Sequence, residues 1–203
     1  FNNHTLHDVA REIAKMQITN SFPLSGLIID LRDNPGGTLQ GAVEVADLFL
    51  DNGTIVSTKG RFNEANQKYQ AHKGDILSGA PIAVLINENS ASAAEILAAA
   101  LRDNQRAVLI GETSFGKGSV QSLIPLGNGN TALKLTTARY YTPSGQSIDG
   151  KGITPDVSIN QTMLSEIDQG VIIKNIQELA LFSSLLDGQD KKQLTAKQLV
   201  IMQ

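Results

Sequence analysis

The sequence predicts an α/β fold in which short buried strands alternate with helices. Three aliphatic runs, at 26–31, 82–86 and 107–110, have the length and composition of strands buried on both faces. Each run ends in a turn rich in glycine or other small residues, and a helical pattern follows each of the first two. Strands separated by helices in this order are typical of a parallel sheet.

The first half of the chain supplies a helix, a strand–turn–helix unit and a hairpin. Residues 5–18 repeat apolar side chains near one helical face. The strand at 26–31 is followed by the breaker DNPGG at 33–37, and a second helical pattern runs from 39 to 50. Residues 54–70 indicate a polar β-hairpin.

The second half adds further strands to this core. The strand at 82–86 leads into a helix of small residues at 90–103, and the strand at 107–110 follows. Alternating or β-branched residues at 118–126 and 131–141 predict two more strands.

We expect the chain to have two parts. Residues 1–160 form the core, and 161–203 form a C-terminal helical segment that packs on the core or on a partner subunit, with a helical pattern from Glu166 to Leu186. The 203 residues are 41% hydrophobic, which is ample apolar material for one compact domain with an appendage.

Composition and charge exclude several classes of function. The net charge is −3 and no basic run exceeds two residues, so we expect no nucleic-acid partner. The absence of cysteine excludes thiolate catalysis, disulfides and cysteine-based metal sites. No apolar run approaches the roughly 18 residues that span a bilayer. His4 and His7 could share a metal, but no cluster supplies a third ligand, so we expect no metal and no other cofactor.

Ser92 is a candidate nucleophile because of where its motif falls. The segment NENSASAAE, at 87–95, joins a buried strand to a helix and places Ser92 in the first helical turn. Amides in that turn lack intrahelical partners and the helix dipole is positive there, so the Ala93 N–H could stabilise an oxyanion. Serine is also a preferred helix N-cap, so this motif alone leaves a purely structural role open.

Lys117 is the candidate base. It lies in GETSFGKGSVQ, at 111–121, which also follows a buried strand. This motif nearly matches the phosphate-binding loop G-x-x-x-x-G-K-[ST], but Gly118 replaces the hydroxyl residue and a strand follows instead of a helix, so we expect no nucleotide binding. A neutral amine can accept a serine proton, and apolar burial favours the neutral form. Gln121, four residues on, would share a strand face with the lysine and could orient it.

A third turn, NPGG at 34–37, ends the first buried strand. Because loops at the carboxyl ends of parallel strands converge in α/β sheets, we expect this turn, Ser92 and Lys117 to meet on one rim. No serine lies in a G-x-S-x-G elbow beside a histidine, so a Ser-His-Asp triad has little support.

These motifs together resemble those of the carboxyl-terminal processing peptidases, also called tail-specific proteases. SASAAEI at 90–96 is similar to the family's serine motif, GETSFGKGSVQ to its lysine motif and DLRDNPGG at 30–37 to its glycine motif. The stretch from Ala138 to Val157 is also similar, and the resemblance covers roughly 24–157.

The resemblance implies a serine endopeptidase that cleaves protein substrates near their C-termini through an acyl-enzyme intermediate. Residue by residue, Ser92 would be the nucleophile, Lys117 the general base and Gln121 the residue that supports the lysine. Ala94 stands where many relatives have a third serine, which is not the nucleophile.

The resemblance also implies the surroundings of this site. The oxyanion hole would use the Ala93 amide and a glycine amide of the NPGG turn, with Gly37 slightly preferred over Gly36. The fold would resemble that of Clp protease and the crotonases, and family members usually work in the bacterial periplasm or cell envelope. Substrates would be proteins or peptides bound through their C-terminal region, and a homo-oligomer stays open. Relatives usually carry a PDZ domain, for which 203 residues leave no room, so we expect a catalytic-core fragment.

Two other functions stay open from the sequence. A catalytically silent module of the same fold could bind peptides by adding a strand to a sheet edge. A crotonase-like acyl-CoA enzyme would need paired carboxylates, for which Glu95 and Glu112 are candidates, although a structural role explains both more simply.

Overall fold

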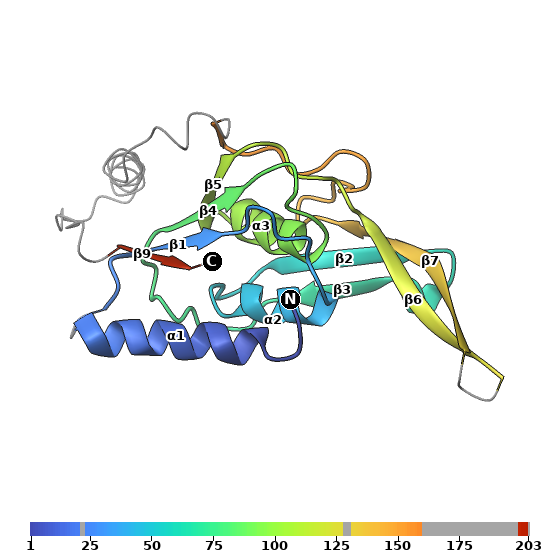
Figure 1. The fold of residues 1–203 in the computed structure, drawn as a ribbon, viewed down its shortest axis with the longest axis horizontal. Helices are drawn as coiled ribbons and strands as arrows, with labels where there is room; N and C mark the ends of the chain where they lie inside the picture. Colours follow the sequence, from blue (N-terminus) through green and yellow to red (C-terminus); the bar gives the residue numbers. More distant parts are fainter. Residues whose placement is uncertain (21–22, 128–130, 160–198, 203) are drawn as a thin grey trace.

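The computed structural model describes residues 1–20, 23–127, 131–159 and 199–202, which form two sheets on either side of a helix (Figure 1). The larger sheet is parallel throughout, with the strand order β8-β5-β4-β1-β9. The smaller sheet is antiparallel, with the order β3-β2-β7-β6. The predicted α/β class, with βα units, additional strands and flanking helices, is confirmed.

The parallel sheet is built on the three predicted aliphatic strands. They are β1 (Gly26–Asp30), β4 (Ile82–Ile86) and β5 (Ala107–Gly111), and β1 and β4 are buried at every position. The short β8 (Val157–Ser158) pairs with β5, and β9 (Leu199–Met202) pairs with β1. A sheet covered on both faces explains why these strands are continuous apolar runs and do not alternate.

Alternate residues of these strands enter two separate apolar clusters. The strand residues that face the helices belong to the main core: Leu27, Ile29, Ile82, Val84, Ile86 and Leu109. The residues between them face the other side of the sheet: Ile28, Ala83, Leu85 and Ile110. The period of two along each strand fixes this division, so the register of the sheet also fixes which residues reach its rim.

Three helices accompany the sheets. They are α1 (Thr5–Asn20), α2 (Leu39–Asp47) and α3 (Ala93–Asp103). α3 is buried along nearly its whole length and contacts α2, β5 of the parallel sheet and β2 of the antiparallel sheet. Its alanine-rich sequence allows these close approaches, because small side chains let neighbouring elements pack near the helix axis.

The antiparallel sheet carries a long hairpin that projects from the body of the molecule (Figure 1). Strands β2 (Thr54–Gly60) and β3 (Gln67–Gln70) flank the short 3-10 helix η1 (Asn63–Ala65). The hairpin itself is β6 (Ser119–Leu126) and β7 (Thr131–Tyr141), at the positions predicted. Because the hairpin leaves the core, several of its aliphatic side chains are exposed: Leu123, Ile124, Leu126, Leu133 and Leu135.

The C-terminal part differs from the prediction where it can be compared. The helical pattern from Glu166 to Leu186 lies outside the described residues. The last residues, Leu199–Met202, were expected in a helical segment but form β9 beside β1. A run of four apolar residues, two of them β-branched, is typical of a strand in a parallel sheet. Within the described ranges, no helix combines the length and apolar character needed to cross a membrane.

Two isoleucines of α1 give a matched test of this packing. Ile13 is fully buried, whereas Ile18 on the same helix is 78% exposed. Ile13→Ala should lower the free energy of unfolding by about 2–5 kcal/mol, because it leaves a cavity. Ile18→Ala makes the same gain in helix propensity and should change it by less than about 0.5 kcal/mol. Urea denaturation followed by circular dichroism measures both, and equal losses would contradict the docking of α1.

Candidate active site

Three loops meet at the carboxyl ends of β1, β4 and β5, as the sequence predicts. The Ala91 amide donates a hydrogen bond to the Asn34 carbonyl (2.9 Å), which joins the glycine turn to the serine turn. The Phe115 amide donates to the Ser90 carbonyl (3.0 Å), which joins the lysine loop to the same serine turn. The serine turn therefore lies between the other two loops and is hydrogen-bonded to both.

Ser92 occupies the N-cap position of α3, directly after the turn that leaves β4. Its backbone has φ 57° and ψ −114°, a conformation that residues with a side chain rarely adopt. Such strain costs on the order of 1–3 kcal/mol and persists only where the surroundings impose it. The capping role and a role as nucleophile are therefore compatible, since one sharp turn provides both.

Glu95 provides the main contact between the serine turn and the lysine loop. Its side chain is fully buried in the first turn of α3. One carboxylate oxygen accepts the Ser92 amide (2.8 Å) and the Lys117 amide (2.9 Å). The other oxygen accepts the Ser114 hydroxyl (2.5 Å) and the Gly116 amide (2.7 Å). A single buried carboxylate thus fixes the backbone on both sides of the expected catalytic pair.

Glu95 joins the two loops, whereas its place in the sequence predicts only a structural role or one half of a carboxylate pair. A signal was present: Ser92 and Glu95 have the S-x-x-E spacing in which the glutamate reaches back to the N-cap amide. No sequence pattern indicates that the same carboxylate also binds a loop 19 to 22 residues further along. Ser114 contributes to this arrangement as well, since its hydroxyl also accepts the Ile153 amide (2.7 Å).

The NPGG turn packs directly against the serine turn. Gly36 has φ 96°, and a Cβ placed on it would lie 2.7 Å from the Ala93 amide nitrogen and 2.8 Å from the Ser92 Cβ. Only glycine fits there, because no side chain could occupy that space. The turn itself is held by the Gly36 amide, which donates to the Asn34 side-chain oxygen (2.9 Å).

The backbone amides of the glycine turn and the serine turn differ in whether they already donate a hydrogen bond. The Gly36 amide is committed to Asn34, whereas within the described part of the chain neither the Gly37 amide nor the Ala93 amide donates a hydrogen bond. Two unpaired donors on adjoining turns are the pattern that an oxyanion hole requires. The preference for Gly37 over Gly36 stays a prediction that this pattern supports.

Asp33 braces the glycine turn against the serine turn. Its carboxylate accepts hydrogen bonds from the side-chain amides of Asn89 (2.8 Å) and Asn87 (3.0 Å), and its own amide donates to Asn87 Oδ1 (2.9 Å). The hydrogen bond from Asn89, followed by that from Asn87, lowers the pKa of Asp33. Asp33 has φ 58°, a left-handed conformation that aspartate and asparagine tolerate better than most residues.

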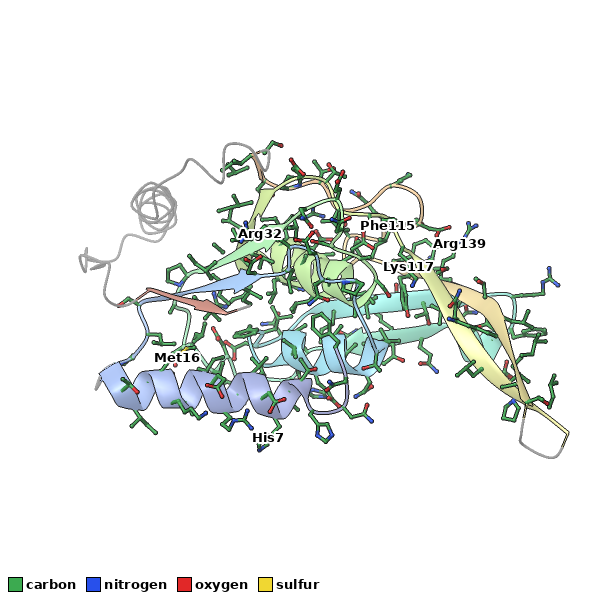
Figure 2. All side chains as sticks on the ribbon, viewed as in Figure 1. His7, Met16, Arg32, Phe115, Lys117 and Arg139 are labelled. Atoms are coloured by element: carbon green, nitrogen blue, oxygen red, sulfur yellow. The ribbon has the colours of Figure 1, made fainter. Side chains whose placement is uncertain are left out.

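The side chains of Lys117 and Gln121 are less constrained than the backbone that carries them. Both are exposed, and no hydrogen bond or ion pair to the Lys117 amine is found among the described residues. Figure 2 shows Lys117 near the base of the β6–β7 hairpin. Because β6 begins at Ser119, Lys117 precedes the strand, and the alternation that was expected to place it on one face with Gln121 does not extend to it.

The other candidate groups lie apart from this site or lack partners of the right kind. His4 and His7 are exposed at the start of α1, and His72 pairs with Asp47 (3.0 Å). No cluster of three His, Asp or Glu side chains in the described ranges is placed to hold a metal ion. A polar hollow of about 660 Å³ opens beside the glycine turn, and its lining includes Arg32 and Pro35.

Comparison with known proteins agrees with the motifs and the fold. The model of peptidase family S41 matches residues 1–159. A carboxy-terminal-processing protease of Bartonella bacilliformis is 51% identical over 166 residues, which cover 80% of this chain and 38% of that protein. A carboxyl-terminal-processing protease of Synechocystis sp. is 41% identical over 162 residues, which cover 80% of this chain and 35% of that protein. The chain therefore spans less than two fifths of the length of these relatives.

Solved structures show the same likeness. The structure described as the photosystem II D1 C-terminal processing protease is 35% identical, with a TM-score of 0.68 over 79% of this chain and 40% of that chain. Mature CPAF is 17% identical with a TM-score of 0.62 over 91% of this chain and 48% of that chain, which is a likeness of fold alone. These matches confirm the fold expected from the resemblance.

Replacement of the buried carboxylate tests whether it holds the site together. Glu95→Gln keeps the shape of the side chain but turns one acceptor into an N–H donor that faces other donors. We expect the free energy of unfolding to fall by about 2–4 kcal/mol, because buried donors lose their acceptor. The exposed Glu88, on the adjoining loop, offers the matched control, since Glu88→Gln should change little. Guanidinium denaturation distinguishes them, and equal stability of the two variants would refute the role of Glu95.

The brace at Asp33 predicts a pH dependence. Because the pKa of Asp33 is lowered in the folded state, its contribution to stability is fully present above the unfolded value of about 3.9. This contribution is lost as the pH falls through the lowered folded value. Asp33→Asn keeps a residue suited to φ 58° but removes the charge. The melting temperatures of wild type and variant should differ at neutral pH and converge in acid; a constant difference would contradict the brace.

Proposed function

Because the chain belongs to peptidase family S41, we propose that it acts as a serine endopeptidase that cleaves protein substrates near their C-termini. The observation that carries this proposal is the Glu95 carboxylate, which binds the backbone amides of both Ser92 and Lys117. Capping of the first turn of α3 would not by itself require Glu95 to bind the lysine loop. A nucleophile and a base on two different loops do require such a link, because their separation must be held within a few tenths of an ångström.

In the proposed mechanism, Ser92 Oγ attacks the carbonyl carbon of the scissile peptide bond while its proton passes to the neutral amine of Lys117. The negative charge on the carbonyl oxygen is stabilised by the Ala93 and Gly37 amides. When the carbon–nitrogen bond breaks, the amine product leaves with the proton from Lys117, and Ser92 remains acylated. Lys117 then takes a proton from water as the water oxygen attacks the ester carbon. The bond from that carbon to Ser92 Oγ breaks, Lys117 returns the proton to Oγ, and the product leaves with a new C-terminal carboxylate.

Because the side chain of Lys117 is exposed, its amine must move to the Ser92 hydroxyl before the proton can be transferred. Its backbone amide is fixed by Glu95, so only rotation about side-chain bonds can bring the amine to the Ser92 hydroxyl. A catalytic hydrogen bond that tightens when substrate arrives is common in enzymes. Gln121, at the start of the hairpin, is proposed to orient the amine in that state.

The wider function is proposed from the relatives. Residues 1–160 would be the catalytic core, with protein or peptide substrates bound through their C-terminal region. The relatives carry names of C-terminal processing proteases, and for a protein of this kind we propose the bacterial periplasm or cell envelope as the location. No step of the mechanism needs a metal or another cofactor.

The nucleophile is tested by paired variants and a reactive probe. We expect Ser92→Ala to reduce peptide cleavage by at least about 10³-fold without loss of stability, because no other group can form the acyl-enzyme. Lys117→Ala should reduce it comparably, whereas Ser119→Ala, at the start of β6, should leave it unchanged. A fluorophosphonate should label wild type but not Ser92→Ala, as measured by intact-protein mass spectrometry.

The outcomes separate the proposed function from its alternative. Cleavage that persists in a clean preparation of Ser92→Ala would refute the assignment of the nucleophile. A wild-type chain that binds peptides but is neither labelled nor active would instead be the catalytically silent module of the same fold.

A further inference from the structure

Phe115 is an exposed aromatic side chain on the loop that carries Lys117. It is 66% exposed, one of four large apolar side chains in the described residues with more than 60% exposure. The other three lie elsewhere: Ile18 on α1, Phe62 after β2 and Leu123 on the projecting hairpin. Isolated exposed apolar residues are common on protein surfaces, so exposure alone indicates nothing. Its position and the rigidity of its backbone are what distinguish Phe115.

The backbone around Phe115 is hydrogen-bonded at each successive residue. The Ser114 amide donates to the Ile153 carbonyl (3.1 Å), and the Phe115 amide donates to the Ser90 carbonyl (3.0 Å). The Gly116 amide is bound by Glu95, and the Gly116 carbonyl accepts the Gly150 amide (2.9 Å). The backbone of the loop is therefore held at each of these residues, and the Phe115 side chain lies on its solvent-exposed side.

The loop conformation reinforces this direction. Gly116 has φ 90°, and a Cβ there would lie 2.8 Å from the Gly152 amide nitrogen, so the chain must turn sharply just after Phe115. The turn sends Ser114 inward to Glu95 and leaves the next side chain outside. An apolar ring exposed to water is unfavourable, and packing within the described part of the chain leaves most of this ring exposed.

The backbone that carries the ring lies beside the serine turn and two residues before Lys117. The carbonyl that binds the Phe115 amide belongs to Ser90, two residues before the nucleophile, and Lys117 follows Phe115 by two residues. Phe115 and Lys117 are also neighbours in Figure 2, near the base of the hairpin. A peptide bound at Ser92 would therefore lie close to the loop that carries the ring.

Resting on the proposed function, we propose that the Phe115 ring is a specificity-determining surface that contacts an apolar side chain of the substrate next to the scissile bond. Contact with an aliphatic or aromatic side chain removes apolar surface of both partners from water. A charged side chain at that place would be desolvated by the ring without a partner. The ring has no part in proton transfer, so its effect is on which peptides are bound and cut.

A peptide panel tests this contact. The peptides differ only in one residue flanking the cleaved bond, on either side in two series, with leucine, phenylalanine, glycine or aspartate at that place. Phe115→Ala should lower kcat/KM for the apolar peptides by about 10–100-fold, mostly through KM, and leave the glycine peptide little changed. Phe115→Leu should keep most of the preference. The rate of fluorophosphonate labelling of Ser92, which needs no flanking side chain, should not change.

Phe62→Ala is the matched control, because Phe62 is 67% exposed on the turn after β2 and its loss should leave the whole panel unchanged. An equal fall of kcat/KM on every peptide, or slower labelling, would mean that Phe115 shapes the catalytic groups and would overturn the proposal. No change in preference would overturn it as well.

A binding measurement separates this inference from the proposed function. In the Ser92→Ala background, fluorescence anisotropy reports peptide affinity without cleavage. If wild type neither cuts nor is labelled, the proposed peptidase function fails, yet a loss of affinity confined to apolar peptides in the Phe115→Ala, Ser92→Ala double variant still supports the contact. Equal affinity of single and double variants for all peptides would refute the contact even in an active enzyme.

Discussion

The structure of the site depends on one buried carboxylate. Glu95 lies in the first turn of α3, fully buried, and accepts four hydrogen bonds from three loop positions and the N-cap amide. A carboxylate offers roughly four lone-pair sites, so these donors satisfy it completely. The positive end of the helix dipole favours a negative charge at this place. The serine turn and the lysine loop together therefore supply the donors that offset the cost of burying this carboxylate.

The parallel sheet brings the three loops of the site close together, and hydrogen bonds and close contacts between the loops fix their relative positions. Parallel pairing brings the carboxyl ends of β1, β4 and β5 to one rim, but it does not by itself fix the positions of the loops relative to one another. The Asp33 brace, the close contact of Gly36 with Ser92 and the Glu95 carboxylate remove that freedom. These contacts do not involve the side chains of Lys117 and Phe115, which are both exposed to solvent at the rim.

Much of this arrangement could be predicted from sequence because it follows local rules. The aliphatic runs predicted the buried strands closely, and the DNPGG breaker predicted the turn between β1 and α2. Convergence of the serine and lysine motifs followed from the strand order of α/β sheets. The links between loops could not be predicted, because the bond from Gly116 to Glu95 joins residues 21 positions apart through the interior. The strand β9 was missed because its pairing partner, β1, lies more than 160 residues earlier.

The strained backbone of Ser92 explains why these links matter for chemistry. A residue with a side chain at φ 57° and ψ −114° costs on the order of 1–3 kcal/mol. A hydrogen bond to a charged group contributes about 1.5–3 kcal/mol, so the bond from the Ser92 amide to Glu95 is of the size needed to offset that strain. This offset holds only while Glu95 stays in place, and the three other donors that keep it there all belong to the lysine loop. The conformation of Ser92 is thus stabilised by a carboxylate that also binds the Lys117 loop, so the backbones of the two proposed catalytic residues are held by the same group.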